Sequence, residues 1–170
     1  MVLRHIVILA AAAGFSASEA AAPQTLSFNC NAMPGEVSAM DQTRLAAATA
    51  ISGNLRAVEM REDNNAQPAA TVKLASRKDF VALQLAPTEP HSGRFVVFVR
   101  HGDAKEEERT ILGEVALNQS VPFSIAQSGK DVVVAAAGQT VSVRQRFRGP
   151  PSMGVSCSTG QFLFDGVSVE

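Results

Sequence analysis

Aromatic residues are scarce: the chain has nine Phe, but no Trp and no Tyr. Sugar-binding proteins usually stack the apolar face of a pyranose on a Trp or Tyr ring, which combines an apolar surface with a negative π-face. Most of the Phe residues fall at positions expected to face a core. The composition therefore argues against an ordinary lectin for neutral glycans.

Strong charge and recognisable catalytic motifs are also missing. Charged residues make up 18% of the chain and its formal net charge is −1, so no general attraction to nucleic acid is expected. The sequence has no Gly-x-Ser-x-Gly elbow, no Gly-rich phosphate loop and no zinc or EF-hand spacing. His91 and His101 lie in turn-like segments far from either Cys. We therefore expect no metal, no cofactor and no nucleic-acid partner.

Only one long apolar run is present, IVILAAAAGF at residues 6–15. It follows Arg4 and His5, and small residues stand at Ser18 and Ala20. This is the layout of a secretory signal peptide, and the run is too short to span a bilayer. We expect residues 1–20 to be removed. Residues 21–170 should then form one secreted or periplasmic domain without a membrane span.

The two cysteines, Cys30 and Cys157, are expected to pair in an oxidising compartment. Strand alternation places Cys30 on the same face as Leu26 and Phe28, and Cys157 on the same face as Val155. Both sulfurs would then point to the apolar side. Two unpaired buried thiols remain the alternative.

Helical periodicity is nearly absent, and short β-rich runs alternate with turn residues. This pattern predicts an all-β sandwich or barrel. The expected strands are 24–30, 43–50, 54–61, 69–75, 79–86, 94–100, 109–117, 121–126, 131–137, 140–148, 153–158 and 161–169. The segment 41–50 is also compatible with a helix. Gly138-Gln139 predicts a two-residue hairpin turn with Gly first, and Asp165-Gly166 predicts a bulge that keeps one core face.

First and last strands that meet, the GQTVSV hairpin at 138–143 and the closing QFLFDGVSVE at 161–170 together resemble the concanavalin A-like jelly roll. Laminin-G modules, legume-type lectins, glucanases and several polysaccharide lyases share this fold. The resemblance implies an antiparallel jelly-roll β-sandwich, and by itself it implies no particular activity.

Polysaccharide lyase family seven is the informative comparison within this group. AVEMR at 57–61 resembles its Arg-x-Glu-Leu-Arg strand and keeps Glu59 and Arg61. QLA at 84–86 has Ala86 where that family has His, and SMGVS at 152–156 has Ser where the family has Lys and Tyr. β-Elimination needs a base and a proton donor, and both are missing in this alignment. The carboxylate spacing of the glucanases is absent as well. We expect no catalytic residues, and a degenerate lyase is the third interpretation.

One strand carries a row of cations. In VSVRQRFRG, 141–149, alternation puts Arg144, Arg146 and Arg148 on one face, opposite the valines. Guanidinium groups bind carboxylates and sulfates in two-point contacts. Together with Glu59 and Arg61, the row is a candidate ligand-binding site, although a solvated outer face or internal ion pairs would give the same pattern. The leading interpretation is a non-catalytic module that binds an extracytoplasmic protein or envelope partner. The alternative is an acidic polysaccharide bound through the arginine row.

Overall fold

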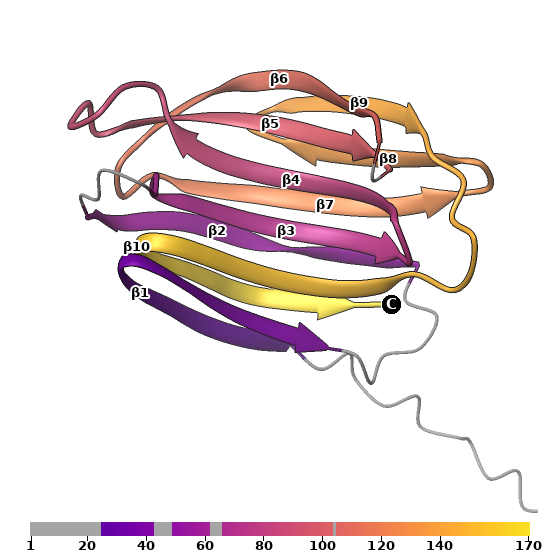
Figure 1. Cartoon of the computed structure of the whole chain (residues 1–170), viewed down its shortest axis with the longest axis horizontal. Helices are drawn as coiled ribbons and strands as arrows, with labels where there is room; N and C mark the ends of the chain where they lie inside the picture. The colour runs from indigo at the N-terminus through magenta and orange to yellow at the C-terminus, as the bar shows by residue number, and fades with distance from the viewer. Residues whose placement is uncertain (1–24, 43–48, 62–65, 104) are drawn as a thin grey trace, which may run out of the picture.

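The computed structural model describes residues 25–42, 49–61, 66–103 and 105–170 (Figure 1). These residues form ten strands and no helix, which confirms the all-β prediction. The strands are β1 (Thr25–Gln42), β2 (Ala50–Met60), β3 (Ala69–Ser76), β4 (Asp79–Pro87), β5 (Arg94–Gly102), β6 (Glu107–Ala116), β7 (Ser120–Ser128), β8 (Asp131–Ala136), β9 (Gln139–Arg144) and β10 (Ser152–Val169). The expected signal peptide, 1–20, and most of the segment 41–50 lie outside the described residues. No helix within the described ranges could cross a membrane.

The strands form two antiparallel sheets that share one strand pair. Residues 152–158 of β10 pair with β3, whereas residues 160–169 pair with β2. Sheet A is therefore β6-β5-β4-β3 with the first half of β10, and sheet B is β2-β7-β8-β9 with its second half. β1 accompanies β10 along both halves (Figure 1). The predicted sandwich and the meeting of its first and last strands are confirmed.

The passage between the sheets is a sharp corner at Thr159 and Gly160. Thr159 is fully buried with a φ of 47°, a left-handed conformation that β-branched residues rarely adopt. A side chain at Gly160 would lie 2.6 Å from the carbonyl oxygen of Glu59, so only glycine fits. The Gly35 amide donates to the Thr159 hydroxyl at 3.3 Å, within a register shift of β1. The expected strand 24–30 therefore continues through a bulge to Gln42, and the two expected strands 153–158 and 161–169 are halves of β10.

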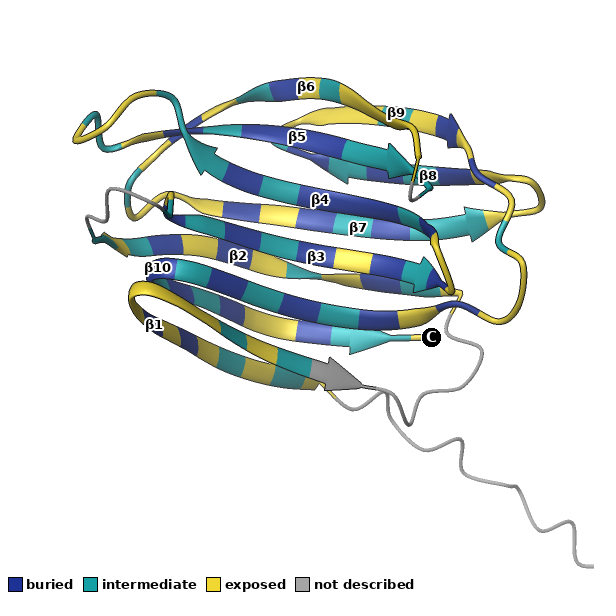
Figure 2. Ribbon diagram, in the orientation of Figure 1, coloured by how far each residue is buried: buried dark blue, intermediate teal, exposed yellow. Residues whose placement is uncertain are grey.

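The core lies between the sheets and follows the alternation of each strand (Figure 2). Its largest fully buried side chains come from both sheets and include Phe95, Phe162, Phe164, Leu55 and Leu83. Gly166, with a φ of 58°, sits in a register shift of β10. This shift is the predicted bulge, and it returns Val167 to the core, where 2% of its surface is exposed.

The predicted disulfide is present and links the two sheets. Cys30 lies on β1 opposite Phe162 in sheet B, and Cys157 lies on β10 opposite Ser38 in sheet A. The two Cα atoms are 6.0 Å apart, and both side chains are buried, as the parity argument required. The bond therefore fixes the angle between the sheets beside the corner.

One turn differs from the prediction. The loop between β8 and β9 is Ala137-Gly138, one residue earlier than expected, and both residues have positive φ (51° and 74°). Positive φ at both positions defines a type I′ turn, in which glycine is favoured second rather than first. The expected Gly-first assignment was therefore wrong.

Replacing both cysteines, Cys30→Ala with Cys157→Ala, should lower the melting temperature by roughly 10 °C. The bond closes a loop of 127 residues, and restricting so long a loop in the unfolded chain is worth about 4–5 kcal/mol. Thermal denaturation followed by circular dichroism measures the change, with reduced parent protein as the matched control. A variant that melts within about 2 °C of the oxidised parent would contradict this role.

Candidate functional site

The predicted arginine row is only partly a strand. β9 ends at Arg144, because Asp131, its partner residue, is the first residue of β8 and no neighbouring strand continues beyond it. The expected strand 140–148 was therefore too long. Arg144, Arg146 and Arg148 are nevertheless all exposed, with Gln145 buried between the first two. Among the described residues, neither the Arg144 nor the Arg146 side chain has an ion-pair or hydrogen-bond partner.

Arg148 has a structural role that the row did not reveal. Its amide and its Nε donate to one Asp79 carboxylate oxygen, both at 3.1 Å, and its Nη2 donates to the other oxygen at 2.9 Å. The Asp79 side chain is only 3% exposed, and Nη2 also contacts Asp103 at 3.3 Å. The hydrogen bonds that its guanidinium donates to Asp79 are the main cause of the raised pKa of Arg148. This arginine thus ties the β9–β10 connection to the β3–β4 hairpin.

The other predicted pair, Glu59 and Arg61, lies at the end of β2. The Arg61 guanidinium contacts the Glu59 carboxylate at 2.8 Å, the Asn31 side chain at 2.6 Å and the Ala32 carbonyl at 2.9 Å. Its side chain is 18% exposed. The structure brings the two residues together. The hydrogen bonds that Arg61 donates to Asn31 and Ala32 link the end of β2 to β1. Neither residue lies beside the arginine row in the strand order, since β7 and β8 separate β2 from β9.

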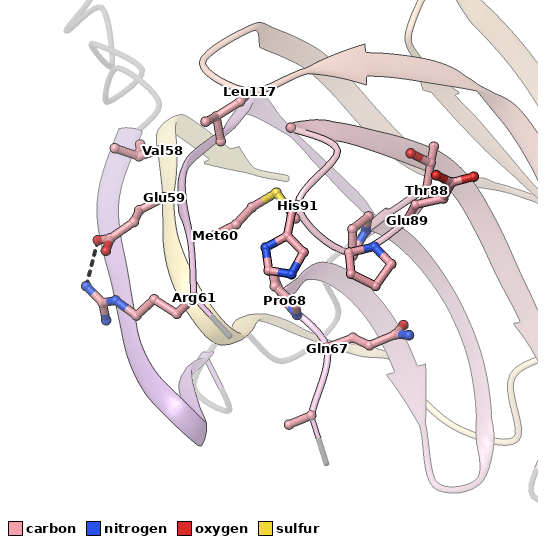
Figure 3. A pocket seen from close by; sticks show the side chains of 14 residues that line it. Val58, Glu59, Met60, Arg61, Gln67, Pro68, Thr88, Glu89, His91 and Leu117 are labelled. Carbon is pink, nitrogen blue, oxygen red and sulfur yellow. Dashed lines mark hydrogen bonds and ion pairs between the residues drawn. The ribbon is translucent and has the colours of Figure 1, made fainter. Parts of the chain in front are cut away.

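A pocket of about 900 Å³ lies at this end of the sandwich, and we call it the end pocket (Figure 3). Its walls are the end of β2, residues 66–68 before β3, the β4–β5 loop at 87–93, and Leu117 after β6. Met60, Pro68 and His91 gather at its centre, whereas Arg61 extends away toward β1 (Figure 3). The pocket is therefore a separate feature from the Glu59–Arg61 pair that borders it.

Sequence reasoning missed a third feature, on the outer face of sheet A. Lys73 stands opposite Ala82, Ala82 opposite Arg100, and Arg100 opposite Arg109. Three cations thus form one row across four strands, spanning roughly 14 Å at the usual strand spacing. The neighbouring rows carry Phe80, Gln84, Phe98, Glu107 and the exposed Ile111. We call this surface the cation–aromatic face.

Aromatic rings lie beneath the cations of this face. The Arg109 guanidinium lies 4.3 Å from the Phe98 ring centre, and the Lys73 ammonium lies 5.1 Å from that of Phe80. Phe98 is only 3% exposed although it lies outside the core between the sheets, which indicates how completely the long side chains cover it. Such contacts are worth about 0.5–1 kcal/mol at exposed sites.

Glu107 is the carboxylate of the cation–aromatic face. It accepts two hydrogen bonds from Arg100, which also donates to Gln84 at 3.0 Å. The hydrogen bonds from Arg100 are the main cause of the lowered pKa of Glu107, so this carboxylate stays ionised well into the acid range. Three cations against one carboxylate leave this face with two positive charges. Lys73 and Arg109 have no carboxylate partner within hydrogen-bond distance among the described residues.

The positions aligned with the lyase strands are divided between the sheets. Gln84 and Ser156 lie in one row of sheet A with Thr71 between them, whereas Glu59 and Arg61 end a strand of sheet B. Within the described ranges, no group of three or more His, Cys, Asp or Glu side chains could hold a metal ion. Two of the three segments that resemble lyase strands therefore lie on one face of sheet A. The third lies in sheet B.

No protein-family model and no curated protein sequence matches the chain. Solved structures do. An alginate lyase from Klebsiella pneumoniae is 11% identical with a TM-score of 0.58, covering 74% of this chain and 60% of the lyase. The Caenorhabditis elegans galectin LEC-6 is 11% identical with a TM-score of 0.53, covering 85% of this chain and 95% of the galectin. The carbohydrate-binding module CBM66 from Bacillus subtilis is 8% identical with a TM-score of 0.50, covering 84% and 85%.

These likenesses confirm the concanavalin A-like jelly roll that the sequence predicted. At such low identity they concern the fold alone. This chain spans about 60% of the length of the Klebsiella lyase.

Arg148→Met should lower the melting temperature by several degrees, because it leaves the buried Asp79 carboxylate without its guanidinium. Losing such a partner costs about 1–3 kcal/mol. Arg144→Met and Arg146→Met are the matched controls and should change the melting temperature little. Adding Asp79→Asn to Arg148→Met should recover part of the loss. Equal melting temperatures for the three single variants would contradict the structural role of Arg148.

Proposed function

We propose that this protein is a non-catalytic carbohydrate-binding module for an anionic polysaccharide, and that it binds on the cation–aromatic face. The observation that carries the proposal is the row of Lys73, Arg100 and Arg109 across neighbouring strands. Like charges placed directly opposite each other destabilise a sheet. Arg100 and Arg109 stand in that arrangement. A ligand that supplies negative charge along the row would offset the repulsion between these cations.

The chemistry of the row suits carboxylate or sulfate groups on a chain. Guanidinium groups bind such anions in two-point contacts, and an ammonium binds them as a point charge. Phe80 and the exposed Ile111 add apolar surface that C–H groups of a sugar ring can contact. The carbohydrate-binding module, the galectin and the alginate lyase of similar fold support a glycan ligand in general.

The disulfide supports a function outside the cytoplasm, since oxidising compartments are where such bonds persist. The proposal therefore includes secretion or a periplasmic location. An anionic polysaccharide would be encountered in the same compartment.

The binding test uses columns of immobilised heparin and alginate, eluted with a salt gradient. The parent should be retained and should elute as salt rises, because exposed ion contacts are screened. Lys73→Glu with Arg109→Glu should abolish retention. Glu107→Gln should delay elution, because it removes the carboxylate that competes with the ligand for Arg100.

The matched control is Arg144→Glu with Arg146→Glu, which changes net charge by the same amount at the predicted arginine row. It should elute close to the parent, and circular dichroism should confirm that both double variants are folded. Loss of retention in this control alone would assign the site to the arginine row instead. A parent that is not retained on either column would overturn the glycan proposal and leave a protein or envelope partner.

The purified protein should show no lyase activity. β-Elimination needs a base and a proton donor, and the aligned positions carry Ala86 and Ser156 in a chain that has no Tyr. Ultraviolet detection of unsaturated uronate ends on alginate, polyguluronate and glycosaminoglycans is the assay. Product formation that disappears on Glu59→Ala or Arg61→Ala, in variants that circular dichroism shows to be folded, would show that the chain is an enzyme.

A further inference from the structure

β1 forms an open edge along one margin of the sandwich (Figure 1). Its only partner among the described strands is β10, which pairs with residues 25–32 in sheet B and with residues 37–42 in sheet A. Every second backbone N–H and C=O of an edge strand points away from its one neighbour and is available to a further strand. Because β1 turns the corner together with β10, this edge has two layers that lie along the same margin.

The edge of β1 lacks the devices that usually keep an edge strand from pairing. Short length, charged side chains and proline are the common ones. β1 has 18 residues, and Glu36 is the only charged residue between Thr25 and Met40. Pro34 stands at the corner, so no proline interrupts residues 25–32. This stretch is therefore open to pairing along its whole length.

The opposite margin of the sandwich has such devices. β6, the edge of sheet A there, carries three Glu and one Arg, and β9, the edge of sheet B, has only six residues. The two edges also approach each other, since a Cβ atom added at Gly113 of β6 would lie 3.7 Å from that of Ala137 in the β8–β9 turn. One margin is thus protected, whereas the margin formed by β1 is open.

Apolar side chains accompany the open edge. Leu26 and Phe28 in sheet B and Met40 in sheet A pack against the core but are only partly buried, because β1 is the outermost strand. Met33 and Val37 flank the corner and are 57% and 73% exposed, and Ile111 alone is comparably exposed among the large apolar residues described. A partner that covers this margin would therefore bury apolar surface on the core side of both layers.

We propose that the partner is a second copy of this chain, paired β1 to β1 so that both sheets continue from one copy into the other. A twofold axis perpendicular to the sheets sets residues 25–32 antiparallel to the same residues of the second copy. In the other layer, the same axis sets residues 37–42 antiparallel to 37–42. An edge with two layers is matched by a partner that offers two edges at the same separation. A second copy does so, whereas a single extended peptide offers one.

The side chains of residues 25–32 are compatible with self-pairing. Antiparallel pairing sets side chains of the same face opposite each other. The core-side residues Leu26 and Phe28 of the two copies then meet on the inner side. The outer side brings together neutral polar residues such as Thr25 and Asn29, so no like charges oppose each other along this stretch. The cation–aromatic face lies on the outer surface of sheet A, and pairing at the edge leaves it uncovered.

Sedimentation equilibrium of the purified protein over a range of concentrations measures the association. The mass should rise from that of one chain to that of two and no further, because a twofold interface is closed. Added salt should change the association little, since residues 25–32 carry no charge. Amide hydrogen exchange at residues 25–32 should slow as the concentration rises, because N–H groups of the open edge gain acceptors.

Thr25→Lys with Asn29→Lys should raise the dissociation constant about tenfold or more, because it sets ammonium groups against each other across the twofold axis. The matched control is Thr140→Lys with Ser142→Lys, which adds the same charge at exposed positions of β9, the other edge of sheet B. It should leave the dissociation constant unchanged, and circular dichroism should show that both double variants are folded.

The proposal is overturned if the parent remains a single chain at millimolar concentration, or if it assembles beyond two chains. It is equally overturned if the two double variants weaken association to the same extent, or if exchange at residues 25–32 does not respond to concentration. None of these results depends on whether the protein is retained on heparin or alginate.

Discussion

The pairing of β1 with β10 is the constraint on which the rest of the structure depends. Within the described residues, these two strands alone belong to both sheets, so their corner sets how the sheets face each other. The corner requires a left-handed threonine and a glycine pressed against the backbone of β2, and a strained backbone persists only where its surroundings hold it. The Thr159 hydroxyl and carbonyl bind the Gly35 and Arg61 amides, and the disulfide closes over the same region. Arg61, suggested by a lyase motif, is thereby explained as part of the corner.

Once the corner fixes the sandwich, the outer faces are free to carry chemistry that packing does not require. In sheet A this freedom is used for a like-charged row that costs stability, and the cost is partly offset by the rings of Phe80 and Phe98 and by Glu107. In the part of sheet B that the structure describes, no three cations form such a row: its exposed positions include Ser52, Asn54, Thr140 and Ser142, and its exposed Arg56 and Arg144 lie on strands separated by β7 and β8. This contrast between two sheets of one domain is what the proposed binding role of the row would explain.

The alternation of apolar and polar residues predicted the features that depend on neighbouring residues in the chain. Alternation predicted the all-β fold, the inward cysteines and the bulge at Gly166, because each depends on neighbours in the chain, but it did not predict all strand ends: the expected strand 24–30 extends to Gln42 in β1, and the expected break at 51–53 lies inside β2. It failed where the outcome depends on partners distant in sequence. β9 stops at Arg144 because β8 begins at Asp131, and Arg148 turns to Asp79, 69 positions away. The row of Lys73, Arg100 and Arg109 was likewise invisible, since four strands contribute to it and their register is set only by pairing. The only signal of the row in the sequence was an outward Lys, Ala or Arg on each of the four strands. Alternation alone does not show that these positions align across the sheet.

The hydrogen bonds that a cation already makes show whether it can bind a ligand. They distinguish the arginines and Lys73 of this protein more sharply than their exposed fractions do. A guanidinium has five N–H donors, and one that has spent them on fixed acceptors can turn to a ligand only by breaking contacts. Arg61, Arg148 and, within the row, Arg100 are in that state, with carboxylate, amide or carbonyl acceptors on several sides. Arg109 and Lys73 are held only against ring faces, which orient the charged groups while leaving their N–H donors open to solvent. A cation that is positioned but not satisfied meets an anion with little loss of conformational freedom and no competing bond. Arg144 and Arg146 have open donors as well, but no ring or acceptor among the described residues positions them, so ordering their long side chains would oppose binding.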